Sequence, residues 1–128
     1  MKYYINKTIT ANFDQAIELV TEALKKESFG VLSEIDIRQK FKEKLDIDFR
    51  KYIILGACSP SHAYQALQNE DKIGTMLPCN IIVQELGENL VEVAAVDPAA
   101  SMTAVDNKEI AIIAIEIKAK LERVIASL

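Results

Sequence analysis

Two cysteines and the single histidine, the side chains of this sequence best suited to covalent or metal chemistry, lie within residues 51–80. Cys58 ends an apolar run, and Ser59-Pro60 then opens a helix that carries His62 in its first turn. A thiol beside a helix start lies near unpaired backbone N–H groups and the positive end of the helix dipole, which favours the thiolate. The sequence therefore offers Cys58 as a reactive thiol with His62 as its proton partner. The simpler alternative is that Cys58 is a small buried residue at a strand end.

Cys79 follows Leu77-Pro78 at the start of another expected strand. If that strand pairs near Cys58, the two sulfur atoms come close together. Beside simple packing, three outcomes then stay open: a reversible disulfide, a soft metal held by Cys58, His62 and Cys79, or a ligand pocket lined by both thiols. The Cys-x3-His spacing with one distant cysteine matches no common zinc pattern, so no metal site is predicted.

Two carboxylates also stand at predicted strand ends, where pockets form. Asp36 is placed to cap a helix from Arg38, and Asp97 before Pro98 is typical of a turn. Both have a structural interpretation, yet both join the candidate ligand-binding residues, which are Asp36, Cys58, Ser59, Pro60, His62, Pro78, Cys79 and Asp97. The sequence contains no glycine-rich phosphate loop, no HExxH and no Ser-His-Asp order, so it predicts neither a catalytic residue nor a cofactor.

The elements that must position these residues begin with a strand over residues 2–10, where apolar and polar side chains alternate. Asn12 followed by Gln15 resembles a capping box, which predicts a helix start. Residues 28–30 end this helix. Its buried stripe is spaced three or four residues apart: Phe13, Ala16, Ile17, Val20, Ala23 and Leu24.

A second strand is expected over residues 31–37 and a short amphipathic helix over 38–45. The run at 52–57 lacks alternation, which indicates a strand covered on both faces. Ser59 is a favourable N-cap for the next helix, and Pro60 suits its first position. The residues of that helix expected to face inward are Ala63, Ala66 and Leu67.

A turn around residues 71–74 leads into a hairpin of strands 80–86 and 90–96. Asp106 is expected to cap a final helix that runs to about residue 127. Beyond its main stripe, this helix has surplus apolar side chains at Ile112, Ile115 and Ala119. The order of elements predicts an α+β fold, with an antiparallel or mixed sheet and the two longer helices packed on one face.

Composition narrows the class of protein. The chain of 128 residues fits a single domain spanning residues 1–128. Its net charge is −4 and its basic residues are scattered, which argues against nucleic acid as a partner. No apolar run approaches the roughly 20 residues that span a bilayer, and the N-terminus shows no signal-peptide pattern, so a cytoplasmic protein without a membrane partner is expected.

Several motifs together resemble the domain-of-unknown-function 302 (DUF302) family. They are the Gly-Ala-Cys-x-Pro element at residues 56–60 and the Leu-Pro-Cys-Asn element at 77–80, with Phe-Gly-Val-Leu at 29–32, Glu-Ile-Asp-Ile at 34–37 and Asp-Pro at 97–98. The resemblance implies a TATA-binding-protein-like topology, a strand and helix followed by a mostly antiparallel sheet and a closing C-terminal helix. It also implies a homodimer. The family has no established activity, and Ser59 stands where it often has asparagine.

The leading hypothesis is an uncharacterised domain that binds a small ligand in a pocket at strand ends, near the two cysteines. A second hypothesis is a homodimeric interaction module that needs no ligand and pairs through the surplus apolar surface of the last helix. A third is a thiol redox or metal-responsive protein. The sequence identifies neither the ligand nor a cofactor.

Overall fold

A single antiparallel sheet is the framework of the molecule. The computed structural model describes residues 2–128, and in it five strands pair in the order β1-β5-β4-β3-β2. The strands are β1 (Tyr4–Thr10), β2 (Gly30–Asp36), β3 (Tyr52–Cys58), β4 (Cys79–Gly87) and β5 (Leu90–Val96). The α+β prediction is confirmed, and the sheet is antiparallel throughout.

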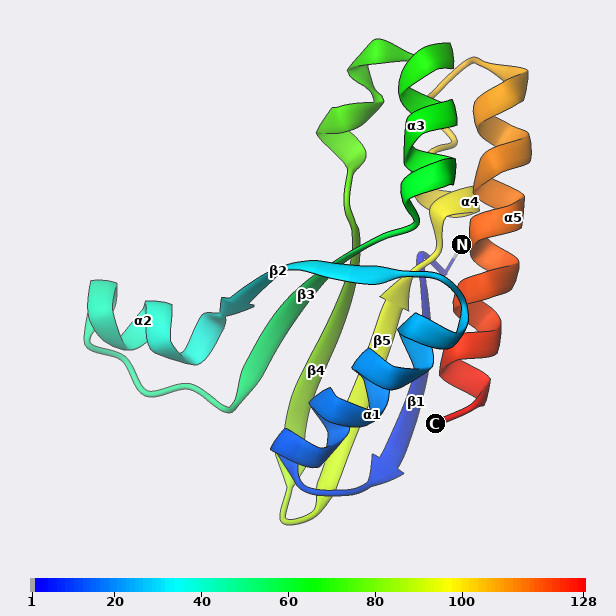
Figure 1. The fold of residues 1–128 in the computed structure, drawn as a ribbon. Helices are drawn as coiled ribbons and strands as arrows, with labels where there is room; N and C mark the ends of the chain where they lie inside the picture. The colour runs from blue at the N-terminus through cyan, green and yellow to red at the C-terminus, as the bar shows by residue number, and fades with distance from the viewer. Residues whose placement is uncertain (1) are drawn as a thin grey trace.

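The two longest helices cover one face of this sheet, as predicted. Helix α1 (Phe13–Lys26) crosses β4 and β5, and α5 (Lys108–Ala126) runs along the sheet beside β1 (Figure 1). The core between them is built from alternate strand residues and the helix stripes, including Leu24, Leu55, Ile81, Val83, Val91, Val93, Leu121 and Val124. Within residues 2–128, no helix is long and apolar enough to cross a membrane.

Helix α1 begins at its predicted capping box, and it ends at Lys26, just before the predicted stop at residues 28–30. Both bonds of the capping box form: the Gln15 backbone N–H donates to the Asn12 side chain at 2.8 Å, and the Asn12 N–H donates to the Gln15 side chain at 3.3 Å. At the other end Ser28 adopts φ of 65°, and the Phe29 N–H donates to the Leu24 carbonyl. This is a Schellman ending, with serine in the position that usually favours glycine.

Beyond the sheet, the chain builds a second, smaller layer on the first half of α5. Helix α3 (Pro60–Asn69) lies beside α5, and the short helices η1 (Asp71–Met76) and α4 (Pro98–Ser101) close the region (Figure 1). Neither short helix was expected, since residues 71–74 predict only a turn. A small buried cluster holds this layer together: Ala66, Ile73 and Ile110.

Two predictions in this layer are wrong. Leu67 is exposed rather than inward-facing, because Ala63 and Ala66 already make the narrow stripe of α3. The N-cap of α5 is Asn107 and not Asp106. The Asn107 side chain accepts from the Glu109 and Ile110 N–H groups and also donates to the Asn69 carbonyl, so it ties α5 to the end of α3.

Helix α2 (Ile37–Leu45) projects away from the rest of the molecule (Figure 1). Asp36 is its N-cap and accepts the Gln39 N–H at 2.9 Å, which confirms the capping role expected for this carboxylate. Strand β2 therefore ends at Asp36, one residue earlier than predicted. None of the α2 side chains is buried.

Candidate functional site

A small cavity lies where the smaller layer meets the sheet, and five of the candidate residues line it. Its volume is about 40 Å³, room for about three atoms the size of a water molecule. The candidates in its wall are Cys58, Ser59, His62, Pro78 and Cys79. The rest of the wall is apolar apart from main-chain groups: Phe29, Ala57, Ala63, Ala66, Leu77, Pro98, Met102, Ile110, Ile113, Ala114 and Ile117.

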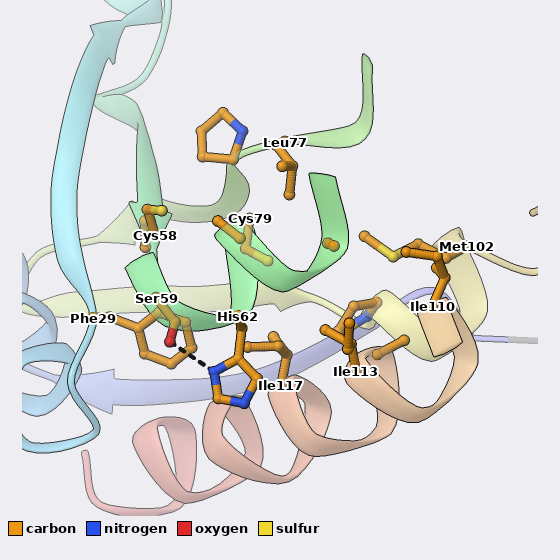
Figure 2. A pocket seen from close by; sticks show the side chains of 16 residues that line it. Phe29, Cys58, Ser59, His62, Leu77, Cys79, Met102, Ile110, Ile113 and Ile117 are labelled. Atoms are coloured by element: carbon orange, nitrogen blue, oxygen red, sulfur yellow. Dashed lines mark hydrogen bonds between the residues drawn. The ribbon is translucent and has the colours of Figure 1, made fainter. Parts of the chain in front are cut away.

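Strand pairing explains why these residues converge. Ala57 is the register partner of Cys79, so β3 ends and β4 begins at the same edge of the sheet. The chain leaves β3 at Cys58 and enters α3 directly, which carries Ser59 and His62 over that edge. Figure 2 shows the residues from both strands and from α5 around a common space.

The two thiols are unpaired, and burial favours their protonated forms. Burial raises the pKa of the Cys58 thiol, so the prediction of a thiolate-favouring setting is wrong. Loss of hydration disfavours the charged form of a thiol there. Burial, and secondarily the nearby Cys58, raise the pKa of Cys79 from 9.0 to about 11. Both shifts favour the neutral thiol over the thiolate.

His62 forms a hydrogen-bonded chain with two oxygen-bearing side chains. Its Nδ1 lies 2.9 Å from the Ser59 hydroxyl (Figure 2), and its Nε2 lies 3.0 Å from Oε2 of Glu116 on α5. Ser59 occupies the N-cap position of α3, yet its hydroxyl makes no cap bond to the helix backbone. The residue is only 5% exposed, and the His62 side chain is 16% exposed. The hydroxyl and the imidazole therefore form the polar edge of the cavity.

Of the three side chains joined by these hydrogen bonds, Glu116 is the one that the sequence did not predict. It is 54 positions from His62 and lies on the exposed side of α5, beside Ile112 and Ala119 at helical spacing. Helical spacing places Glu116 one turn after the cavity-lining Ile113, which is the one sequence signal that pointed toward it.

Three predicted candidates lie outside the cavity wall. Asp36 caps α2, on the projecting side of the sheet. Pro60 is exposed at the first position of α3. Asp97 is only 7% exposed, but it accepts from the Ala99 and Ala100 N–H groups and pairs with Lys118 at 3.1 Å. Asp97 therefore holds the neighbouring Pro98, which does line the cavity.

A metal site gains no support from the geometry. Across residues 2–128, no three His, Cys, Asp or Glu side chains are grouped so that they would hold a metal ion. The set of Cys58, His62 and Cys79 lines one cavity without forming such a group.

The sheet is tightly packed behind the cavity. A Cβ atom added to Gly56 would lie 2.3 Å from the Ser33 Oγ and 2.7 Å from the Pro78 Cγ. The Gly-Ala-Cys element therefore begins with glycine because β2 and Pro78 approach the backbone of β3 at this point.

Comparisons with known proteins agree on the family. The chain matches the family model described as "Domain of unknown function DUF302" over residues 5–128. A solved structure, that of an uncharacterized conserved DUF302 protein from Bacillus stearothermophilus, is 24% identical and superposes with a TM-score of 0.90, covering 98% of each chain. No curated protein matches this sequence. Because the family model covers nearly the whole chain, this protein belongs to the DUF302 family.

Proposed function

We propose that this domain binds a small molecule with an apolar part of a few heavy atoms and one polar group. The supporting observation is the composition of the cavity, which is apolar except where the Ser59 hydroxyl and the His62 imidazole form one edge. Sites of this kind bind by burying apolar surface and use a few fixed polar groups to orient the ligand. The two thiols stay reduced in such a site, in keeping with a cytoplasmic protein.

The size of the cavity predicts which ligands fit. At about 40 Å³ it takes an apolar group of about three or four heavy atoms, and a longer chain has no room. A series of straight-chain alcohols from ethanol to hexanol tests this, with binding followed by amide chemical shifts. We expect saturable shifts at Ala66, Ala114 and His62, with affinity rising to propanol or butanol and then falling.

Variants that fill the cavity provide the decisive test of ligand binding. Ala114 lines the cavity from α5, and Ala66 lines it from α3. Ala114→Leu and, separately, Ala66→Val should abolish the saturable shifts while the proteins remain folded. Ala111→Leu is the matched control, because Ala111 is exposed on the same helix and should leave binding unchanged. Alcohol shifts that persist in both filled variants would place binding elsewhere and overturn the proposal.

We also propose that the protein pairs with a second copy of itself through α5. Ile112 and Ile115 are 52% and 62% exposed, and with Ala119 they form one stripe at helical spacing. Exposed apolar stripes of this kind are typical of interaction surfaces. Residues of this stripe lie on a helix whose opposite side builds the core, so pairing there leaves the fold intact.

Light scattering after size exclusion, over a range of protein concentrations, tests the pairing. We expect a dimer that the double variant Ile112→Glu/Ile115→Glu converts to a monomer. Leu19→Glu is the control, since Leu19 is 49% exposed on a different helix. A monomeric wild-type protein at high concentration would contradict the pairing, and a dimer unaffected by the double variant would move it to another surface.

A further inference from the structure

We infer that Ser59, His62 and Glu116 form a nucleophile–base–acid array that hydrolyses esters of short acyl groups, the acyl group being held in the cavity. This deepens the proposed function and rests on it, since the array stands at the edge of the same cavity. The two distances, 2.9 Å from Ser59 Oγ to His62 Nδ1 and 3.0 Å from His62 Nε2 to Glu116 Oε2, both lie within hydrogen-bond range. A nucleophile bonded to a base, itself bonded to a carboxylate, is the arrangement that activates a hydroxyl.

The carboxylate of Glu116 determines which nitrogen of His62 carries the proton, and so the direction of both hydrogen bonds. An ionised carboxylate only accepts hydrogen bonds, so His62 Nε2 must carry the proton that lies between it and Glu116. In a neutral imidazole, Nδ1 is then the acceptor, and the Ser59 hydroxyl donates to it. The base is therefore oriented to take the Ser59 proton without any rearrangement.

The local structure leaves the hydroxyl free for this role. A serine at an N-cap usually accepts a backbone N–H of the first turn. Ser59 stands at that position with extended backbone angles, φ of −97° and ψ of 103°, but makes no such bond. Its hydroxyl is engaged with the imidazole alone, and the N–H groups of the first turn of α3 keep no side-chain acceptor.

The neighbouring residues select the substrate. Phe29 and Ile117 line the cavity together with Ser59 and His62. An acetyl, propionyl or butyryl group fits a space of about 40 Å³, whereas an octanoyl chain does not.

The chemical steps balance without any cofactor. Ser59 Oγ attacks the ester carbonyl carbon while His62 Nδ1 takes the hydroxyl proton, and the carbonyl π electrons pass to the oxyanion. The oxyanion collapses, the bond to the alkoxy group breaks, and His62 protonates the departing alcohol. Water then attacks the acyl-serine with His62 again as base. Release of the carboxylic acid returns the proton to Ser59, so one ester and one water give one acid and one alcohol.

Methanesulfonyl fluoride and p-nitrophenyl esters test the array. The reagent is small enough for the cavity and sulfonylates activated serines with loss of fluoride, so the modified residue can be mapped by mass spectrometry. We expect modification at Ser59, slowed at least about 100-fold by His62→Gln, since a general base contributes about that much. Hydrolysis of p-nitrophenyl acetate and butyrate should saturate and be lost in Ser59→Ala, and the octanoate ester should react poorly. Ser61→Ala, an exposed serine of the same turn, should change neither rate.

Glu116 acts through His62 and is a positioning residue, so its test needs a separate readout. The chain has one histidine, and the ¹⁵N signals of its ring therefore report its tautomer without ambiguity. We expect the form protonated at Nε2 in the wild-type protein and a mixture of tautomers in Glu116→Ala, together with slower sulfonylation. Glu116→Asp should restore part of both.

The outcomes separate this inference from the function on which it rests. If the alcohols bind as expected but Ser59 is sulfonylated no faster than in His62→Gln, the array is not catalytic and the binding function stands. If ester hydrolysis persists in Ser59→Ala, another residue is the nucleophile and the inference is overturned. If neither alcohols nor the reagent engage the cavity, both proposals fail.

Discussion

Helix α5 has two halves that pack in different ways. Its C-terminal half places Leu121, Val124 and Ile125 against α1 and the sheet, where branched side chains fill the space. Its N-terminal half lies beside α3, where Ala114 meets a helix whose inner side is also alanine. Methyl groups on both helices are too short to fill the gap between two helix backbones. Small side chains on both helices therefore border the cavity, and the hydrogen bonds that join Ser59, His62 and Glu116 lie at its edge.

The largest expected effect is a difference in stability between variants of the two halves of α5. Leu121→Ala removes a fully buried side chain from the filled half, and we expect the free energy of unfolding to fall by about 3 kcal/mol. Ile113→Ala removes a side chain that borders the cavity and is partly exposed, so the fall should be about 1–2 kcal/mol. Urea denaturation of both variants measures the difference. Equal losses would mean that the two halves are equally well packed.

A second prediction concerns the sheet behind the cavity. Gly56→Ala forces a Cβ against Ser33 and Pro78, and overpacking of this kind should lower the free energy of unfolding by about 2 kcal/mol. Gly30→Ala is the control in the neighbouring strand, since nothing lies within 4 Å of its added Cβ. We expect thermal denaturation to leave that control near the wild-type midpoint. If Gly56→Ala is as stable as the control, Ser33 and Pro78 can move to accommodate the added methyl group. The wall of the cavity formed by Pro78 would then be mobile.

A third prediction is a pH dependence of the free energy of unfolding at the junction of the two regions. The pKa of Cys79 is raised by burial from 9.0 to about 11 in the folded protein. The unfolded chain therefore loses this proton first as the pH rises. The contribution to stability is fully present below pH 9 and is lost progressively between pH 9 and 11, by up to about 2 kcal/mol.

Urea denaturation at pH 8, 10 and 11 measures this loss, and Cys79→Ala is the comparison. The variant should begin less stable and then show a flatter pH dependence than the wild-type protein over this range. An unchanged slope in the variant would mean that Cys79 is hydrated through the cavity. That result would mean that the cavity contains water, and it would weaken the proposed difference in packing between the two halves of α5.

Much of the fold could be predicted because its signals are local. The Asn12–Gln15 capping box, the apolar run of β3 and the hairpin strands each depend on neighbours a few residues apart. The errors arose where a distant contact decided the outcome. Asn107 caps α5 in place of Asp106 because it also reaches the Asn69 carbonyl.

The candidate site was predicted in part for the same reason. Cys58, Ser59 and His62 follow one another in the chain, and Pro78 and Cys79 join them because β3 and β4 pair at their ends. The position of Glu116 beside His62 depends on how α5 is rotated against α3. The sequence shows only which residues share a face of α5. The ionisation of Cys58 depends on burial, which a helix-start argument alone does not include.

The position of β1 has a consequence for how the chain folds. Tyr4 pairs with Val96, so the first strand of the sheet in chain order forms its ladder with the last one. Long-range pairing of this kind slows folding, because a large loop must close before the contacts form. During synthesis β1 has no strand partner until β5 has emerged, so its backbone hydrogen-bonding groups stay unpaired until then. Encounters between nascent chains at that stage are where strand exchange between copies would begin.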